Sequence, residues 1–127
     1  MAQQRRKPSD RDRPKRRYIV FEVVSKEPLG MQHVADAIQR SCGEFHDKGM
    51  KFVHDTWDPA HNQGIVRVAH AHAKPLCMAL NSMTAIGNTQ VEVKTLGMSG
   101  ILRQAKLKFM KNKTIRKENK RNYHHRV

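Results

Sequence analysis

Nearly all of the excess positive charge of this chain lies at its two ends. Residues 1–17 hold eight Lys or Arg side chains against two acids, a net charge of +6, and residues 103–127 hold ten against one, a net charge of +9. Residues 18–102 hold seven basic and eight acidic side chains, a net charge of −1. Blocks of like charge repel each other and stay extended unless a polyanion neutralises them. We therefore expect one near-neutral folded domain between two basic segments that bind a polyanion.

The size and composition of the chain agree with a single domain. It has 127 residues, and its 38% of hydrophobic residues falls below the roughly 45–50% of globular proteins, so a second core is not expected. No run reaches the roughly 18 apolar residues of a membrane span, and no apolar segment follows the basic N-terminus as in a secretory signal. Cys42 and Cys77 do not make a disulfide framework. We predict an intracellular protein with a flexible basic arm (1–15), a domain (16–110) and a basic tail (111–127) that is disordered or extends the last helix.

The first half of the domain has the pattern strand, helix, strand, strand. Residues 16–25 are β-branched and aromatic, which is typical of a buried strand. Apolar residues then recur at the spacing of one helix face from residue 31 to about residue 43. Residues 51–57 are predicted to form a second strand, residues 58–64 a turn and residues 65–69 a third strand, so that the last two strands pair as a hairpin.

The second half repeats the helix and the strand. A helix is expected from residue 70 or 71 to residue 86, but Pro75 fits only in the first turn, which favours a start near His72. Gly87 and Asn88 are predicted to end this helix. Residues 89–95 alternate between apolar and polar, as a half-exposed strand does. Residues 101–109 form an amphipathic helix with a basic outer face.

The order β-α-β-β-α-β followed by a helix predicts an α+β fold, the ferredoxin-like sandwich. In this fold a four-stranded antiparallel sheet carries both helices on one face. We expect the additional C-terminal helix to cover the other face. Sheets of this kind bind RNA, sense small molecules or handle metals, so the fold alone does not determine the function.

RNA-recognition proteins of this fold stack bases on aromatic side chains of the central strands. Here the strand at residues 64–70 has no aromatic residue. Only Tyr18 and Phe21 of the first strand are available, and one of them must face the core because their positions differ in parity. Base stacking on the sheet is therefore disfavoured. Arg67 is either an RNA contact or an ordinary exposed charge of its strand.

The segment 95–100 leads into the last helix and is predicted to be a loop. Gly97 and Gly100 allow backbone N–H groups to approach an anion, and Ser99 or Thr95 is a candidate cap of the helix. A helix N-terminus attracts phosphate, and Lys94 and Arg103 flank this one. The combination suits a nucleic-acid backbone, and a plain capped turn without ligand is the alternative.

Metal binding and catalysis have little support in the sequence. The closest histidine pairs are His70 with His72 and His124 with His125, and neither these nor the two cysteines have the spacing of a zinc site. The cysteines are expected to be small buried residues. No nucleophile stands in a pattern with a base, so no catalytic residue is predicted.

Three stretches carry a resemblance to a known family: residues 15–23 (KRRYIVFEV), residues 63–68 (QGIVRV) and residues 94–106 (KTLGMSGILRQAK). In this order they resemble the archaeal ribonuclease P protein component two, which has a eukaryotic counterpart shared by ribonucleases P and MRP. The third stretch is the most specific. Met98 and Ile101 stand where the family pattern has Val and Thr, which weakens any role for a hydroxyl at the second position. The His-rich tail lies outside the resemblance.

The resemblance implies a subunit that assists an RNA enzyme. Ribonuclease P cuts the 5′ leader from precursor tRNA with an active site of RNA and bound Mg²⁺, so the chain itself is expected to bind no cofactor and to supply no catalytic group. The family's protein pairs with a TIM-barrel-like subunit, component three, in a two-plus-two assembly on the catalytic domain of the RNA, and meets precursor tRNA only indirectly. The expected location is the cytoplasm of an archaeon, or the nucleus and nucleolus of a eukaryote.

The candidate RNA-binding residues combine the motifs with the nearby basic side chains. They are Arg16, Arg17, Arg67, Lys94, Thr95, Gly97, Ser99, Gly100, Arg103, Lys106 and Lys108. Two other functions stay open: a ferredoxin-like regulator that senses a small anion at the same loop, and a general ribosomal or chaperone-type RNA binder. The basic tails alone also fit a role in solubility or nuclear targeting.

Overall fold

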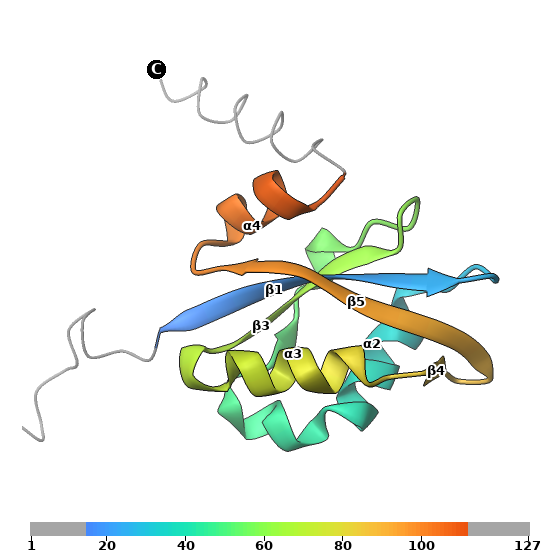
Figure 1. Cartoon of the computed structure of the whole chain (residues 1–127), viewed down its shortest axis with the longest axis horizontal. Helices are drawn as coiled ribbons and strands as arrows, with labels where there is room; N and C mark the ends of the chain where they lie inside the picture. The colour runs from blue at the N-terminus through green and yellow to red at the C-terminus, as the bar shows by residue number, and fades with distance from the viewer. Residues whose placement is uncertain (1–14, 112–127) are drawn as a thin grey trace, which may run out of the picture.

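The computed structural model describes residues 15–111, which form one antiparallel sheet with helices on both faces (Figure 1). The basic arm lies outside this range except for Lys15, and the tail except for Lys111. In chain order the elements are β1 (Arg16–Ser25), α2 (Met31–Ser41), the 3-10 helix η1 (Gly43–Lys48), β2 (Lys51–Phe52), the 3-10 helix η2 (His54–Thr56), β3 (Gln63–Ala69), the 3-10 helix η3 (His70–His72), α3 (Ala73–Asn81), β4 (Ala85–Ile86), β5 (Thr89–Ser99) and α4 (Leu102–Phe109).

The sheet confirms the predicted fold class. Its strand order is β2-β3-β1-β5-β4, with every neighbouring pair antiparallel. The helices α2 and α3 lie on one side of the sheet and α4 lies on the other (Figure 1), as expected. The sheet has five strands where four were predicted, because the short β4 pairs with the start of β5. We call the side with α2 and α3 the inner face and the side with α4 the outer face.

The predicted strand at residues 51–57 is wrong beyond its second residue. The strand β2 ends at Phe52, and the 3-10 helix η2 follows it. The Thr56 hydroxyl donates a hydrogen bond of 2.6 Å to the Val53 carbonyl, a local bond that competes with strand pairing. The ring of Trp57 then folds back on Phe52, with 6.3 Å between the ring centroids. Local turn chemistry thus overrides the β propensity of this segment.

The predicted helix 70–86 is also too long. Residues 70–72 form η3, α3 covers only 73–81, and residues 85 and 86 form β4. Pro75 is the third residue of α3, so its place in the first turn is confirmed. Gly87 and Asn88 turn the chain between β4 and β5, with Gly87 at φ +62°, and do not end a helix.

The segment 95–100, predicted to be a loop, is mostly strand. The strand β5 runs to Ser99 and pairs with β1 along nearly its whole length. Val20 pairs with Gly97 and Phe21 pairs with Thr95, so Leu96 is an extra residue that bulges from the ladder. One continuous strand therefore leads toward α4, in place of the predicted strand followed by a glycine-containing loop.

Burial of β1 on both faces places it at the centre of the molecule. Ile19 and Phe21 belong to the larger core between the sheet and the inner helices. Val20 belongs to a smaller core under α4, with Tyr18 packed at its edge. The prediction that only one of Tyr18 and Phe21 faces the main core is confirmed, since Phe21 is fully buried there.

Candidate RNA-binding surface

A row of four polar side chains crosses the outer face of the sheet. Arg67 of β3 lies opposite Lys51 of β2 on one side and Tyr18 of β1 on the other, and Tyr18 lies opposite Ser99 of β5. Residues directly opposite each other in a sheet share a face. Since Tyr18 packs against the core under α4, the whole row lies on the outer face. We call these four residues the polar row.

The next row of the outer face is apolar and lies under α4. Val20 is opposite Ile65 and Gly97, and both Val20 and Ile65 are fully buried. A Cβ added to Gly97 would lie 2.3 Å from the Phe109 ring, so this glycine makes room for α4. The structure therefore gives Gly97 a packing role inside a strand, while its predicted contact with an anion stays a prediction.

The end of α4 is held to the sheet by one buried side chain. Gln63, which is 1% exposed, accepts a hydrogen bond of 2.9 Å from the Lys111 N–H at its Oε1. Its Nε2 donates to Glu22 Oε1 at 3.1 Å. Buried amides must satisfy both their donor and their acceptor, so these two bonds fix where α4 ends on the outer face.

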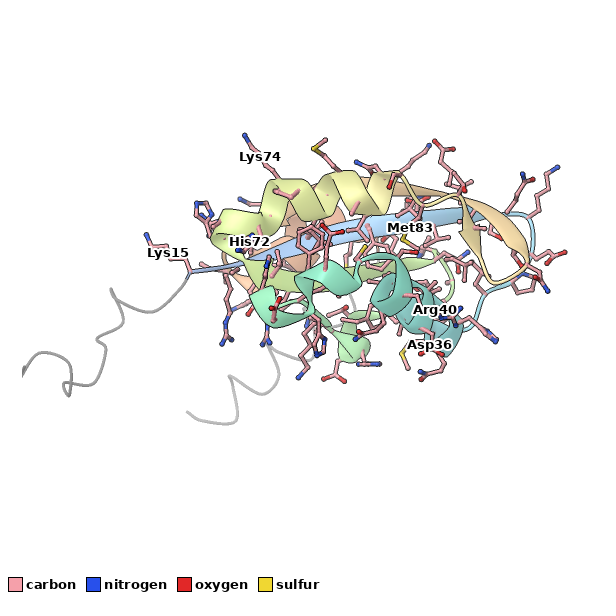
Figure 2. The ribbon with its side chains drawn as sticks, turned by 90° about the horizontal axis from the view of Figure 1, so that it is seen from below. Lys15, Asp36, Arg40, His72, Lys74 and Met83 are labelled. Carbon is pink, nitrogen blue, oxygen red and sulfur yellow. The ribbon has the colours of Figure 1, made fainter. Side chains whose placement is uncertain are left out.

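A groove lies beyond the polar row, at the end of the sheet where β1 begins. It has a volume of about 990 Å³. Its lining residues are Arg16, Tyr18, Asp47, Lys48, Gly49, Ala69, His72 and Gly100. Figure 2 shows Lys15 and His72 at this same end of the molecule. The groove and the polar row share Tyr18 and form one continuous surface.

The basic residues of α4 lie on two sides of the helix. Ala105 is fully buried and Leu102 and Phe109 pack beside it, which defines the buried face. At 3.6 residues per turn, Arg103 and Lys106 flank this face on one side and Lys108 on the other. Arg103 and Lys108 are exposed and Lys106 is half-buried.

The predicted caps of α4 are wrong. The N-cap is Ile101, and no side chain caps the helix. The Ser99 hydroxyl instead accepts a hydrogen bond of 3.2 Å from the Ile101 N–H, just before the helix. Thr95 is paired in β5 and exchanges hydrogen bonds with Asn81 at the end of α3. Thr95 therefore lies on the inner face, away from the polar row.

The structure divides the predicted RNA-binding residues into groups. Arg16, Arg67, Ser99 and Gly100 come together around Tyr18 and the groove. Arg17 donates to the Arg16 carbonyl at 3.1 Å, with its guanidinium beside Gly100. Lys94 lies opposite Glu22, five residues back along β5 from Ser99 and thus roughly 15 Å away.

Sequence reasoning missed Lys48 and Lys51, which the fold adds to this surface. Lys51 is opposite Arg67, and Lys48 lines the groove. Alternation along β2 indicates that Lys51 faces away from the core, since Phe52 faces into it. No local pattern in the sequence links Lys48 to Arg16. The two residues line one groove because η1 packs against β3.

The histidines and cysteines give no metal site within residues 15–111, where no three His, Cys, Asp or Glu side chains gather around one point. His70 and His72 lie at the strand-helix junction predicted for them, in η3, and His124 and His125 lie outside the described residues. Cys42 is fully buried, and Cys77 is half-buried. Burial raises the pKa of the Cys42 thiol to about 11, with a smaller contribution from Glu44.

The fold and this surface define a small ferredoxin-like protein with a cationic outer face. A model of the Rpp14/Pop5 family matches residues 17–110. The chain therefore belongs to the Rpp14/Pop5 family. No helix among residues 15–111 is long and apolar enough to cross a membrane.

Individual relatives agree with this assignment. "Ribonuclease P protein component 2" of Thermococcus kodakarensis is 31% identical over 102 residues, which cover 77% of this chain and 85% of that protein. The protein of the same name from Methanothermobacter thermautotrophicus is 28% identical over 106 residues, covering 76% and 86%. A chain in the cryo-EM structure of yeast ribonuclease MRP superposes with a TM-score of 0.57 at 11% identity, over 93% of this chain and 98% of that one. That likeness shows the shared fold.

Proposed function

We propose that this chain is a protein subunit of ribonuclease P and that it binds and stabilises the catalytic domain of the RNA that removes 5′ leaders from precursor tRNA. The observation that carries this proposal is the family match over residues 17–110, which spans every element from β1 to α4. Relatives named as ribonuclease P components align over most of both chains.

The role we assign to the chain is electrostatic. Arg103 and Lys108 are exposed on α4, and Arg16, Lys51 and Arg67 stand on the sheet beside it. Cations on a rigid surface neutralise phosphates and release counterions, which favours compact RNA. The bond-breaking step belongs to the RNA and its Mg²⁺, and the protein lowers the Mg²⁺ concentration that the RNA needs.

The protein partners we propose are the TIM-barrel-like component three and a second copy of this chain, in a two-plus-two assembly. One exposed apolar side chain supports a protein contact away from the basic surface: Met78 of α3 is 73% exposed. Large apolar side chains are more often found in the centre of interfaces than on free surfaces. Precursor tRNA is then met through the RNA. The compartment follows the host, the cytoplasm in an archaeon and the nucleus in a eukaryote.

Reconstitution tests the proposed function. The full chain is mixed with the ribonuclease P RNA and the component three protein of its own organism, and cleavage of precursor tRNA is measured from low to high Mg²⁺. We expect the chain to shift the cleavage curve to lower Mg²⁺. No shift, or the recovery of only other RNAs with the chain purified from its host, would contradict the proposal.

The salt dependence of RNA binding tests the role of the basic ends. Affinity should fall by about 0.7–0.9 log unit per log unit of salt for each phosphate neutralised. Removal of residues 1–15 and 112–127 should therefore flatten this slope. An unchanged slope would mean that the ends are not the electrostatic contact.

Arg103 tests the contribution of α4. The variant R103A should reduce cleavage at low Mg²⁺ and leave it unchanged at high Mg²⁺, because the ion replaces the lost charge. The neighbouring exposed Gln104 gives a matched control, Q104A, which removes a polar side chain without a charge. Equal activity of R103A and Q104A at low Mg²⁺ would leave α4 as a structural helix only.

A further inference from the structure

Two like charges face each other on the outer face of the sheet, and no acidic side chain among residues 15–111 forms an ion pair with them. Lys51 and Arg67 are directly opposite across β2 and β3. Like charges in this position destabilise a sheet. The ion pairs found between residues 15–111 join Lys48 with Asp47 and His61 with Asp58, and neither involves this pair. The repulsion between Lys51 and Arg67 therefore destabilises the sheet at one defined position.

The Arg67 side chain also has an unused donor. Its Nε is buried and has no hydrogen-bond partner among the described residues. Buried polar groups are almost always paired, so an unpartnered buried donor on this half-buried side chain needs an explanation. An anion placed between Lys51 and the solvent-accessible part of the Arg67 side chain neutralises both cations. A guanidinium group suits the oxygens of a phosphate group, because it is planar and offers several N–H donors.

The surroundings favour a phosphate that is part of a chain. The polar row runs directly into the groove lined by Arg16, Tyr18 and Lys48, whose volume of about 990 Å³ is far larger than a free phosphate needs. Two further cations, Arg16 and Lys48, line this groove, Lys48 is paired there with the Asp47 carboxylate at 3.6 Å, and Tyr18 lines the groove opposite Arg67. A nucleic-acid strand fits this arrangement, because it presents its phosphates to cations and its sugars and bases to an aromatic side chain.

We propose that Lys51 and Arg67 bind one phosphodiester group of an RNA strand, and that the adjoining nucleotide enters the groove lined by Arg16, Tyr18 and Lys48. This site rests on the proposed function, because it takes the RNA to be the partner of the outer face. It is separate from Arg103 and Lys108 of α4, and it uses Lys48 and Lys51, which no sequence motif contains.

The experiment compares charge-neutral variants on the two faces of the sheet. K51Q and R67Q alter the proposed site. K74Q and R40Q remove the same charges on α3 and α2, where Figure 2 shows Lys74 and Arg40 on the inner-face helices. Binding of the cognate ribonuclease P RNA, and of a twelve-residue oligouridine, is measured for the full chain over a range of salt. Inorganic phosphate is added as a competitor, to distinguish a site for free phosphate from a site for a strand.

The expected result is a loss specific to the outer face. K51Q and R67Q each weaken binding about three- to tenfold, and the double variant lowers the salt slope by about 0.7–0.9, the value of one phosphate contact. K74Q and R40Q bind as the wild type does. The double variant loses less than the product of the two single losses, because both side chains bind one phosphate. R67K keeps the salt slope and still loses affinity, since a lysine ammonium lacks the planar set of donors of the guanidinium.

Several results would overturn the site. If K51Q and R67Q bind RNA as well as K74Q and R40Q do, the proposed site is wrong. If the two single losses multiply in the double variant, the two side chains bind two separate phosphates. Displacement of oligouridine by millimolar phosphate would assign the site to the free ion. Because R67Q changes a half-buried residue, its melting temperature is compared with that of K51Q, which alters only an exposed side chain.

The failure of the site and the failure of the proposed function give different results. If the wild-type chain supports cleavage and K51Q and R67Q do so equally, the function stands and the site is wrong. If the wild-type chain gives no support to the cognate RNA while both variants still lose oligouridine binding, the site stands and the ribonuclease P role is wrong.

Discussion

The two faces of the sheet are built in different ways. Among residues 15–111, the inner face buries nineteen residues in one cluster with α2 and α3, whereas the outer face buries four under α4. The inner-face cluster includes Phe21 of β1 and Leu80 of α3, and it holds most of the apolar area removed from water. The outer face covers one apolar row and leaves the polar row beside it partly exposed, with Lys51 exposed and the other three side chains half-buried. The inner face therefore supplies stability, and the outer face is available for binding.

The largest effect is expected from emptying the inner core. Phe21→Ala removes a fully buried ring that lies 6.2 Å from Phe52 and 6.4 Å from Trp57, centroid to centroid. A cavity of this kind costs about 3–5 kcal/mol of unfolding free energy. Urea denaturation followed by circular dichroism measures it. A loss below about 1 kcal/mol would mean that the core collapses around the gap and that the inner face does not dominate stability.

A smaller loss is expected from separating α4 from the outer face. Gly97→Val places a side chain where the Phe109 ring lies and should cost about 1–3 kcal/mol, because the ring must move. Amide exchange along α4 should rise more than exchange along α2. Gly43→Ala is the matched control, since nothing lies within 4 Å of its added Cβ. Equal effects of the two variants would show that α4 does not depend on the packing at Gly97.

A small gain is expected at the polar row. In the absence of RNA, K51Q should raise the unfolding free energy by about 0.2–1 kcal/mol, because it removes one of two like charges facing each other. The gain should shrink in high salt, where the charges are screened. A loss of stability in K51Q would show that the Lys51 side chain contributes packing that outweighs the repulsion.

The smallest effect on stability near neutral pH is expected from Cys42, the thiol of the inner face whose pKa is strongly raised by burial. Burial raises the pKa of Cys42 from 9.0 to about 11, so the folded protein holds this proton more tightly than the unfolded chain. The resulting stability is complete below pH 9 and is lost as the pH rises toward 11. Iodoacetamide at pH 8, followed by mass spectrometry, should modify the half-buried Cys77 faster than Cys42. Faster modification of Cys42 would mean that the inner face opens readily.

The local patterns of the sequence were sufficient for the elements with strong periodicity. The bounds of β1 and the start of α2 agree with the prediction, as does Pro75 in the first turn of α3. The errors fall where tertiary pairing overrides local preference. Residues 85 and 86 continue the apolar pattern of a helix, yet they pair with β5 because the Gly87 turn brings them beside it.

The candidate site was only partly accessible from the sequence. The motifs identified Arg16, Arg67 and Ser99, and the structure brings them together around Tyr18. The motif at residues 94–106 also contains Thr95. The bulge at Leu96 places this residue toward the inner face, where its N–H donates a hydrogen bond to Asn81. A bulge changes which side chains share a face, and nothing in the order of residues 94–100 indicates its position.

The sequence by itself determined the class of fold, the family and the confinement of excess charge to the two ends, because these depend on periodicity, motif and composition along the chain. Only the tertiary structure decided which cations share a surface. Lys51, Arg67 and Arg16 are far apart in the sequence, and strand register alone places two of them opposite each other and the third one row away. Register depends on the pairing of whole strands across a common core, so it is a property of the folded sheet.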